Sequence, residues 1–350
     1  MLNFLPWQTA DAVRLLNEPN QLAHALLLHG LAGSGKHEFA LALAGALLCE
    51  NRQLQGACGQ CESCLLMLSG NHPDFARVRP EAQAALEGDA SGTDDAADAA
   101  VGDAGTGGKR KLSEELKVEQ IRALEPWYHR ATHRGGWRIV VLYPAEALSI
   151  ISANALLKSL EEPPPNTLFL LTSDAPDRLL PTIVSRCQKF ALGLPDWQQS
   201  TAWLTAQGVQ DAAKWLAASG GAPLAALAAS QSMDDACPKW AQTLMSQLGS
   251  AQSIDVAMLA DTLAKGPSAT WLSVLQRMAH DLMLKAGGLP ARYYPDLAAA
   301  TPAPLANKLN LDRIVELSHW LNQQMRLARH PLNAKLFSQA CVQHFCDAVS

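Results

Sequence analysis

The chain of 350 residues is 48% hydrophobic and 17% charged, which is typical of a globular protein of two or three domains and excludes collagen-like or wholly disordered chains. Its 28 Lys and Arg against 33 Asp and Glu give a formal net charge of −5, without the basic excess expected of a protein that binds nucleic acid alone. No apolar run reaches the ~18–20 residues that span a bilayer, and Met1–Ala10 lacks an export-signal pattern, so we expect a cytoplasmic protein.

Short apolar runs separated by alanine- and leucine-rich segments organise the first part of the chain. Strands are predicted at 22–29, 138–143 and 167–173, and helices at 37–49 and 152–162. Strands that alternate with helices indicate a parallel sheet covered by helices. We therefore predict an α/β domain over about residues 1–194.

A segment with almost nothing to bury interrupts this pattern at residues 81–108. It holds seven acidic and no basic residues, nine alanines and six glycines. Such a composition predicts a disordered acidic surface insertion. The alternative, a solvated alanine-rich helix, applies mainly to residues 81–87.

The composition after Leu194 changes to Ala, Leu, Trp and Gln, with breaks at Ser219–Pro223 and Gly266-Pro267. No strand-like run remains, so this half is predicted to be helical. We expect a small helical domain over about 195–235 and a larger helical bundle over about 236–350. Trp240, Trp271 and Trp320 suit either bundle cores or subunit contacts.

Four of the eight cysteines fall within sixteen residues, at Cys49, Cys58, Cys61 and Cys64. The cytosol keeps thiols reduced, so the spacing C-x8-C-x2-C-x2-C favours a metal site over disulfides. We predict one structural Zn²⁺ per chain, because four protein thiolates leave no open position for water. An iron–sulfur cluster fits the spacing less well. His72 is a possible substitute ligand, but a histidine at the surface or at a helix entry is the simpler interpretation.

A glycine loop follows the first predicted strand, and its Gly30, Gly33, Gly35 and Lys36 have the spacing of a Walker A phosphate loop. The next residue is normally Ser or Thr, whose hydroxyl binds Mg²⁺, but here it is His37. The loop amides and Lys36 leave ATP binding open. ATP hydrolysis is not expected.

Together with the cysteine spacing, three motifs carry a resemblance to a known family: Asn71-His72-Pro73-Asp74, the run from Asn154 to Pro164 (NALLKSLEEPP), and Ser185-Arg186-Cys187. The chain resembles AAA+ subunits of the bacterial DNA polymerase III clamp loader, most closely the delta-prime type. The resemblance is strong over about residues 20–190. It implies a RecA-like P-loop domain with a zinc module at about 49–64, a small helical lid at 195–235 and a helical collar domain at 236–350.

Departures from the ATPase pattern separate the delta-prime type from the ATP-hydrolysing gamma/tau type. His37 replaces the Mg²⁺ ligand, Tyr143 stands where an acidic residue should end the second predicted strand, and Pro223 stands where an active relative has a nucleotide-sensing Arg. The resemblance thus implies a stator subunit of the polymerase III holoenzyme with no ATPase activity of its own. Its implied partners are gamma/tau and delta in a hetero-oligomeric ring, with the sliding clamp and primed DNA as shared substrates.

Arg186 keeps a function in this interpretation. The arginine of this motif reaches the γ-phosphate held by a neighbouring subunit, where it stabilises the charge of the transition state. The simpler interpretation is a surface ion pair.

Two rival functions remain for the chain. One is a gamma/tau-type ATPase that uses Lys36, with Glu146 or Asp174 as the missing acid. The other is a zinc-dependent nucleic-acid-binding module, which the negative net charge disfavours.

Overall fold

The computed structural model describes residues 2–53, 55–88, 112–128, 130–133, 136–233, 235–249, 254–300, 309–328 and 333–349. The chain divides into two compact units, Met1–Pro195 and Asp196–Ser350. Among the described residues, no helix is both long and apolar enough to cross a membrane.

A five-stranded parallel sheet forms the centre of the first unit, with the strand order β2-β3-β4-β1-β5. Its strands are β1 (Ala25–His29), β2 (Phe75–Val78), β3 (Arg138–Leu142), β4 (Thr167–Ser173) and β5 (Gln188–Ala191). The register places His29, the last residue of β1, opposite both Ser173 of β4 and Ala191 of β5. The segments that follow these three strands therefore meet at the carboxyl edge of the sheet.

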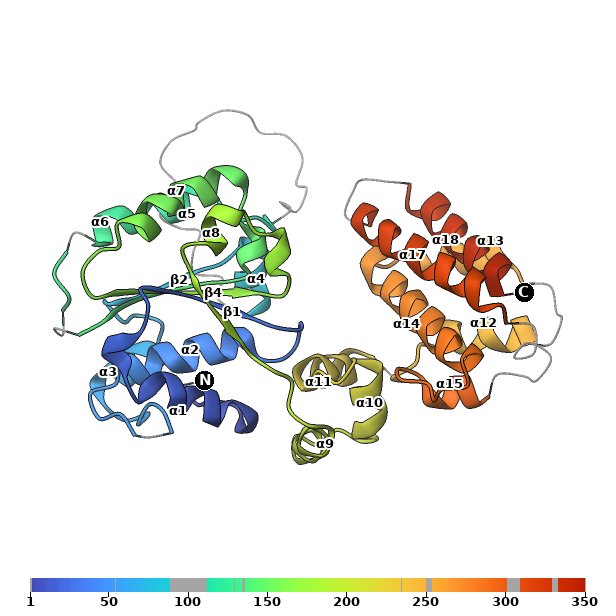
Figure 1. Ribbon diagram of the computed structural model, residues 1–350, viewed down its shortest axis with the longest axis horizontal. Helices are drawn as coiled ribbons and strands as arrows, with labels where there is room; N and C mark the ends of the chain where they lie inside the picture. Colours follow the sequence, from blue (N-terminus) through green and yellow to red (C-terminus); the bar gives the residue numbers. More distant parts are fainter. Residues whose placement is uncertain are drawn as a thin grey trace, which may run out of the picture. The chain divides into compact units, whose positions relative to one another are not determined.

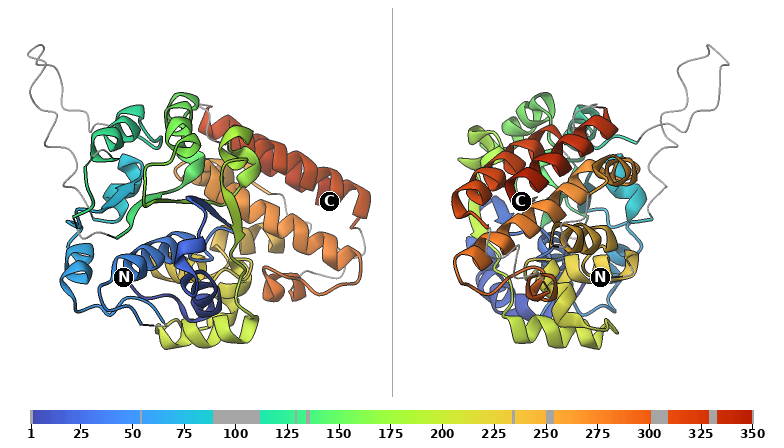
Figure 2. Two further views of the ribbon diagram at one scale, coloured as in Figure 1. Left: turned by 60° about the vertical axis from the view of Figure 1, so that its left-hand side comes forward. Right: turned by 90° about the vertical axis from the view of Figure 1, so that its right-hand side faces the viewer.

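Helices cover both faces of the sheet, as the blue and green helices show in Figures 1 and 2. The first unit contains α1 (Thr9–Leu16), α2 (Lys36–Leu48), α3 (Glu62–Leu68), α4 (Glu81–Leu86), α5 (Val118–Arg122), α6 (Leu124–Tyr128), α7 (Ile150–Glu161), α8 (Pro181–Val184) and the short 3-10 helices η1 (Pro6–Gln8), η2 (Pro19–Gln21), η5 (Ala145–Ala147) and η6 (Pro176–Arg178). Successive residues of β1 enter different cores, because side chains of a strand alternate between its faces: Leu26 and Leu28 pack with α1 and α2, and Leu27 packs with α5 and α7.

The α/β prediction is confirmed by the parallel sheet and its helices. The three predicted strands and two predicted helices are present, with ends that differ by up to three residues. Strands β2 and β5 were not predicted, because each has only four residues and few of them are fully buried. Such short, half-polar runs carry little of the periodicity from which a strand is recognised.

The predicted insertion needs a correction at its first end. Residues 81–86 form helix α4 rather than a disordered segment, and Glu81 binds the far side of the insertion, where its carboxylate accepts from Ser113 N at 3.2 Å and pairs with Lys117. Ala82 N also donates to Ser113 O at 3.0 Å. The two ends of the insertion are thus fastened together at their base. The remainder, residues 89–108, lies outside the described residues.

The second unit is helical throughout the part of it that the structure describes. Its helices are α9 (Trp197–Ala206), α10 (Ala212–Ala218), α11 (Pro223–Ser232), α12 (Lys239–Gly249), α13 (Val256–Leu263), α14 (Ser268–Ala286), α15 (Pro295–Ala299), α17 (Leu311–Leu327) and α18 (Ala334–Val349). A small core around Leu204 and Leu216 joins α9 to α11, and a larger core joins α12 to α18. Trp271 is buried in the larger core, and Trp240 and Trp320 pack against it.

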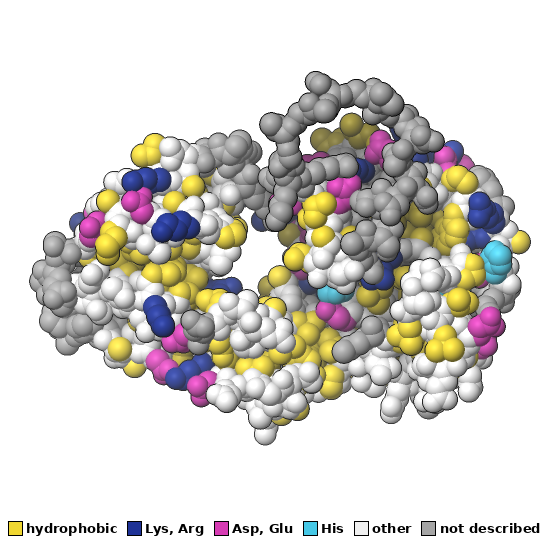
Figure 3. Space-filling view, turned by 180° about the vertical axis from the view of Figure 1, so that it is seen from behind, with side chains coloured by type: hydrophobic (Ala, Val, Ile, Leu, Met, Phe, Trp, Pro, Cys, Tyr) yellow, Lys and Arg dark blue, Asp and Glu magenta, His cyan; other side chains and the backbone are white. Residues whose placement is uncertain are grey.

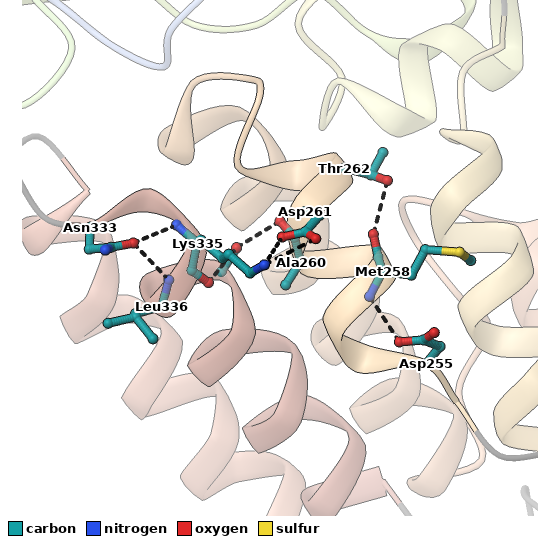
Figure 4. A network of polar contacts seen from close by, with 9 residues as sticks. Asp255, Met258, Ala260, Asp261, Thr262, Asn333, Lys335 and Leu336 are labelled. Atoms are coloured by element: carbon teal, nitrogen blue, oxygen red, sulfur yellow. Dashed lines mark hydrogen bonds and ion pairs between the residues drawn. The ribbon is translucent and has the colours of Figure 1, made fainter.

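Polar contacts fasten α13 to α18 within this bundle (Figure 4). Lys335 Nζ lies 2.8 Å from Asp261 Oδ1, and Ser338 Oγ donates to the carbonyl of Ala260 at 2.9 Å. Asp255 accepts from Met258 N at 2.9 Å and caps the first turn of α13. Because Ser338 is buried, its bond adds a directional contact to an otherwise apolar interface.

Candidate functional site

The four cysteines predicted to bind metal converge in the first unit. Their sulfur atoms all lie within 4.8 Å of one another, and the Cys49–Cys61 and Cys58–Cys64 pairs are each 3.9 Å apart. Four sulfurs arranged around Zn²⁺ at the usual ~2.3 Å would be about 3.8 Å apart, as the edges of a tetrahedron. The donor set and its spacing therefore fit a metal ion bound by four thiolates.

The backbone between the cysteines explains this convergence. Cys49 follows helix α2, and Cys61 is the N-cap of α3, where its sulfur accepts from Cys64 N at 3.4 Å. Gly59 has φ +74°, a left-handed conformation that suits glycine and turns the chain between Cys58 and Cys61. A helix end, a glycine turn and a helix start thus bring residues of one short segment around one point.

Backbone donors also prepare the thiols for a metal. N–H groups of Gln60 and Cys61 lower the pKa of Cys58 to about 6. Burial acts in the other direction at Cys64 and raises its pKa. Metal binding requires thiolates, so the cluster contains one thiol that ionises readily and one that needs the metal's charge to do so.

His72 lies behind the cluster and is buried, which corrects the interpretation of a surface or helix-entry histidine. Its Nδ1 accepts from Asp74 N at 3.1 Å, and its Nε2 lies 2.8 Å from Ser63 Oγ, which donates to Leu48 O at 2.6 Å. Since Leu48 precedes Cys49 and Ser63 precedes Cys64, His72 supports the backbone on which two of the cysteines stand. It is not one of the four converging residues.

The phosphate loop, residues 30–37, connects β1 to α2 at the carboxyl edge of the sheet. A Cβ atom added to Gly30 would lie 2.3 Å from the carbonyl oxygen of Leu192, which follows the neighbouring strand β5. Gly33 and Gly35 have φ of +76° and +92°. Each of the three predicted glycines therefore has a steric or conformational reason to be glycine.

Lys36 is buried and its ammonium group is engaged within the chain. Nζ donates to the carbonyl of Leu31 at 2.7 Å and lies 2.6 Å from Asp174 Oδ1. Only 6% of the Lys36 side chain is exposed, against 53% of Asp174. Two of the three N–H donors of the ammonium thus have partners in the loop and at the end of β4.

His37, the residue after Lys36, contacts Tyr143, the residue after strand β3. Their rings stack with centroids 5.4 Å apart and an angle of 12° between the planes. Tyr143 donates its hydroxyl to Glu87 Oε2 at 2.7 Å, and burial, more than this bond, raises its pKa. Two aromatic rings therefore stand where the resemblance places the oxygen ligands of Mg²⁺.

Glu146, one of the two acids considered as a replacement, is bonded to the end of β4. Its Oε1 accepts from Ser173 Oγ at 2.6 Å and from Ala175 N at 2.7 Å. These bonds hold the residues on both sides of Asp174, Ser173 through its hydroxyl and Ala175 through its backbone N–H. Asp174, the other acid, is the residue that pairs with Lys36.

Arg186 lies at the opposite edge of the sheet from the phosphate loop. It precedes β5, whereas the loop follows β1, and the two strands are parallel. The four residues of β5 span about 13 Å. At this amino edge the guanidinium pairs with Glu161 through an Nη2–Oε1 contact of 2.5 Å and donates from Nη1 to Thr182 O at 2.9 Å.

Sequence reasoning missed two residues that hold the phosphate loop. Trp7 Nε1 donates to the carbonyl of Ser34 at 3.2 Å, and Gln8 Nε2 donates to that of Gly35 at 2.7 Å. Gln8 is almost completely buried. The signal available was weak: a Trp-Gln pair directly before α1, a helix that was not predicted, with no spacing that relates the pair to the loop.

Charges on the visible face of the molecule are mixed. In Figure 3, Lys and Arg side chains are interspersed with Asp and Glu and do not form one continuous basic field on that face. This distribution agrees with the net charge of −5.

Comparison with known proteins finds similarity to subunits of DNA polymerase III. The chain is 38% identical over 230 residues to the DNA polymerase III subunit delta' of Pseudomonas aeruginosa, a match that covers 65% of this chain and 61% of that protein. It is 32% identical over 179 residues to the subunit tau of Escherichia coli, covering 51% of this chain and 23% of that protein. The chain therefore matches only about three fifths of the length of the delta' relative.

A solved structure of a gamma subunit-related protein of DNA polymerase III from Thermotoga maritima aligns with a TM-score of 0.48 and 14% identity, covering 98% of this chain and 100% of that one. Residues 9–195, more than half of the chain, match the family described as "DNA polymerase III, delta subunit". This match shows that the chain belongs to the DNA polymerase III delta subunit family, and five of its relatives, at 32–38% identity, are delta' subunits.

Proposed function

We propose that the chain is a non-hydrolysing, delta-prime-like subunit of a cytoplasmic DNA polymerase III clamp loader. It would assemble with gamma/tau and delta subunits and help to load the sliding clamp onto primed DNA. Arg186 would serve the ATP of a neighbouring subunit. The four-cysteine cluster would hold one structural zinc ion, with α9–α11 acting as a lid and the helices from α12 onward as the collar.

The observation that carries this proposal is the separation of Arg186 from the chain's own phosphate loop. The two lie at opposite edges of a parallel sheet, about one strand length apart, so Arg186 is poorly placed to contact a phosphate on Lys36. One third of its side chain is exposed. A partly exposed arginine on the far edge suits a role on a partner's phosphate, for which it would exchange its contact with Glu161.

The absence of hydrolysis is supported by the contacts at the loop. Lys36 is engaged by Leu31 and Asp174, and the stacked His37 and Tyr143 rings offer no oxygen ligand for Mg²⁺ from the side chains that normally provide one. Purified protein is therefore expected to turn over ATP no faster than a Lys36→Ala variant. Lys36-dependent turnover would instead support a gamma/tau-type ATPase, which the similarity to tau keeps as the second candidate.

The role of Arg186 is tested in the complex reconstituted with gamma and delta subunits. Arg186→Ala should fold and assemble, and DNA-stimulated ATP hydrolysis and clamp loading should fall at least tenfold, because fingers of this kind contribute about 10³–10⁵ in rate. Arg186→Lys should restore part of the rate, since an ammonium lacks the planar pair of donors. Arg178→Ala, an exposed arginine of helix η6 in the same unit, is the control. Parental rates for Arg186→Ala would refute the trans-acting role.

A further inference from the structure

The phosphate loop keeps the shape of an anion cradle. Gly33 and Gly35 hold left-handed conformations, and the side chains of Trp7 and Gln8 bind the carbonyls of Ser34 and Gly35 from outside the loop. Ser34 N donates to Leu31 O at 3.3 Å within the loop. The other loop amides and the first turn of the 13-residue helix α2 are the donors that this loop offers to an anion.

The hydroxyl of Ser34 is a buried polar group of this cradle. Ser34 is 1% exposed, and its Oγ has no hydrogen-bond partner among the described residues. A buried hydroxyl without a partner is unfavourable, and an oxygen of an anion is a group with which it would form a hydrogen bond.

Asp174 supplies a negative group to the lysine of the cradle. The register of the sheet explains its position: Ser173 lies opposite His29, so the residue after β4 stands beside the loop after β1. Glu146 accepts from the hydroxyl of Ser173 and from the backbone N–H of Ala175. The pairing of β1 with β4, together with the hydrogen bonds of Glu146, thus places the Asp174 carboxylate beside Lys36.

We propose that Asp174 is an internal anion that occupies Lys36 and keeps polyphosphate out of the loop, so that removing this single carboxylate restores binding of ATP or tripolyphosphate. This inference rests on the proposed non-hydrolysing function. It adds a second reason for the lack of hydrolysis, exclusion of the nucleotide, to the missing side-chain ligands of Mg²⁺. A carboxylate and a phosphate oxygen bind an ammonium in the same way, and only one can hold this position. The charge of Asp174 also repels an incoming polyphosphate.

The restored site should bind without hydrolysing. Substitution of Asp174 leaves His37 stacked on Tyr143, so the usual side-chain ligands of Mg²⁺ are still missing. Binding and hydrolysis therefore respond to different residues of this loop.

Isothermal titration of the full chain tests the inference, with ATP and with inorganic tripolyphosphate in the absence of Mg²⁺. Asp174→Asn keeps the size of a half-exposed side chain and should lower the dissociation constant for both probes about tenfold or more relative to the parent protein. Asp177→Asn, in the same connecting segment, removes an equal charge and should change affinity by less than about twofold. The double variant Lys36→Met/Asp174→Asn should lose the gain.

Equal affinities for the parent and Asp174→Asn, with unchanged circular dichroism, would overturn the inference. So would a gain that survives in the double variant, because the anion would then not use Lys36. If Asp174→Asn does not fold, Asp174→Ser takes its place with the same expectation. ATP turnover by the parent protein would refute the proposed function instead, and the two failures are distinguished because turnover and affinity are measured separately.

Discussion

The phosphate loop lies at the first end of helix α2 and the cysteine cluster lies at its last end, and the two regions differ in how their polar groups are paired. Lys36, its first residue, belongs to a loop whose charged groups bind one another, whereas Cys49, directly after its last residue, belongs to a cluster of four groups of the same kind. A lysine and an aspartate can neutralise each other, but four thiols cannot act as one another's counter-ions. Unlike charged groups can neutralise each other within the fold, whereas four thiolates at this spacing would need a cation from outside.

The largest effect is expected from removing one ligand of the metal ion proposed for the cysteine cluster. Cys61→Ser should abolish stoichiometric zinc, about one ion per parental chain, and lower the free energy of unfolding by about 4 kcal/mol or more, because a structural metal contributes folding free energy directly. Elemental analysis and urea denaturation measure the two effects. Cys237→Ser, outside the cluster, is the control and should retain zinc. A metal-free parent protein, or one that holds iron, would end the zinc assignment.

A steric change in the phosphate loop should have the next largest effect. Gly30→Ala places a Cβ 2.3 Å from a backbone oxygen that follows β5, and the overpacking should cost about 3 kcal/mol. Gly193→Ala, one residue beyond that oxygen, has open space and should cost less than about 1 kcal/mol. Equal melting temperatures for the two variants would show that the sheet edge relaxes easily.

The ion pair between Lys36 and Asp174 should contribute little to the free energy of unfolding, in contrast to the metal cluster. Lys36→Met retains most of the buried stem and leaves Asp174 exposed to water, so we expect a loss of about 1 kcal/mol. Lys158→Met removes a pair with Glu125 in which both side chains are mostly exposed, and should change stability by less than about 0.5 kcal/mol. Chemical denaturation that ranks Lys158→Met above Lys36→Met would contradict this order.

The smallest effect is expected from the acidic insertion. Deletion of residues 88–107 should change the free energy of unfolding by less than about 0.5 kcal/mol, because α4 and Ser113 are fastened to each other without the deleted residues and shortening a loop alters its closure entropy only slightly. Clamp loading should also stay near the parental rate. Insoluble protein after the deletion would reveal a structural role for the segment.

Spacing and hydrophobic pattern predicted the groups with local signatures. The four cysteines and the glycine loop are defined by short intervals, and β4 contains a continuous apolar run, LFLL, with all seven of its residues buried. The Lys36–Asp174 and Arg186–Glu161 pairs could not be predicted in this way. Their members are separated by many residues. Lys36 meets Asp174 because the register of β1 and β4 brings their ends together. Arg186 meets Glu161 because α7 packs against α8.

The ion pair between Lys36 and Asp174 has a consequence for how such a loop changes over evolutionary time. A lysine that contributes to stability is retained by selection for folding even if no nucleotide ever binds, so a phosphate-loop signature persists after its first use is lost. An aspartate differs from an asparagine by a single nucleotide in its codon. The capacity to bind a polyphosphate would then be one point mutation away, while the capacity to hydrolyse it would require several.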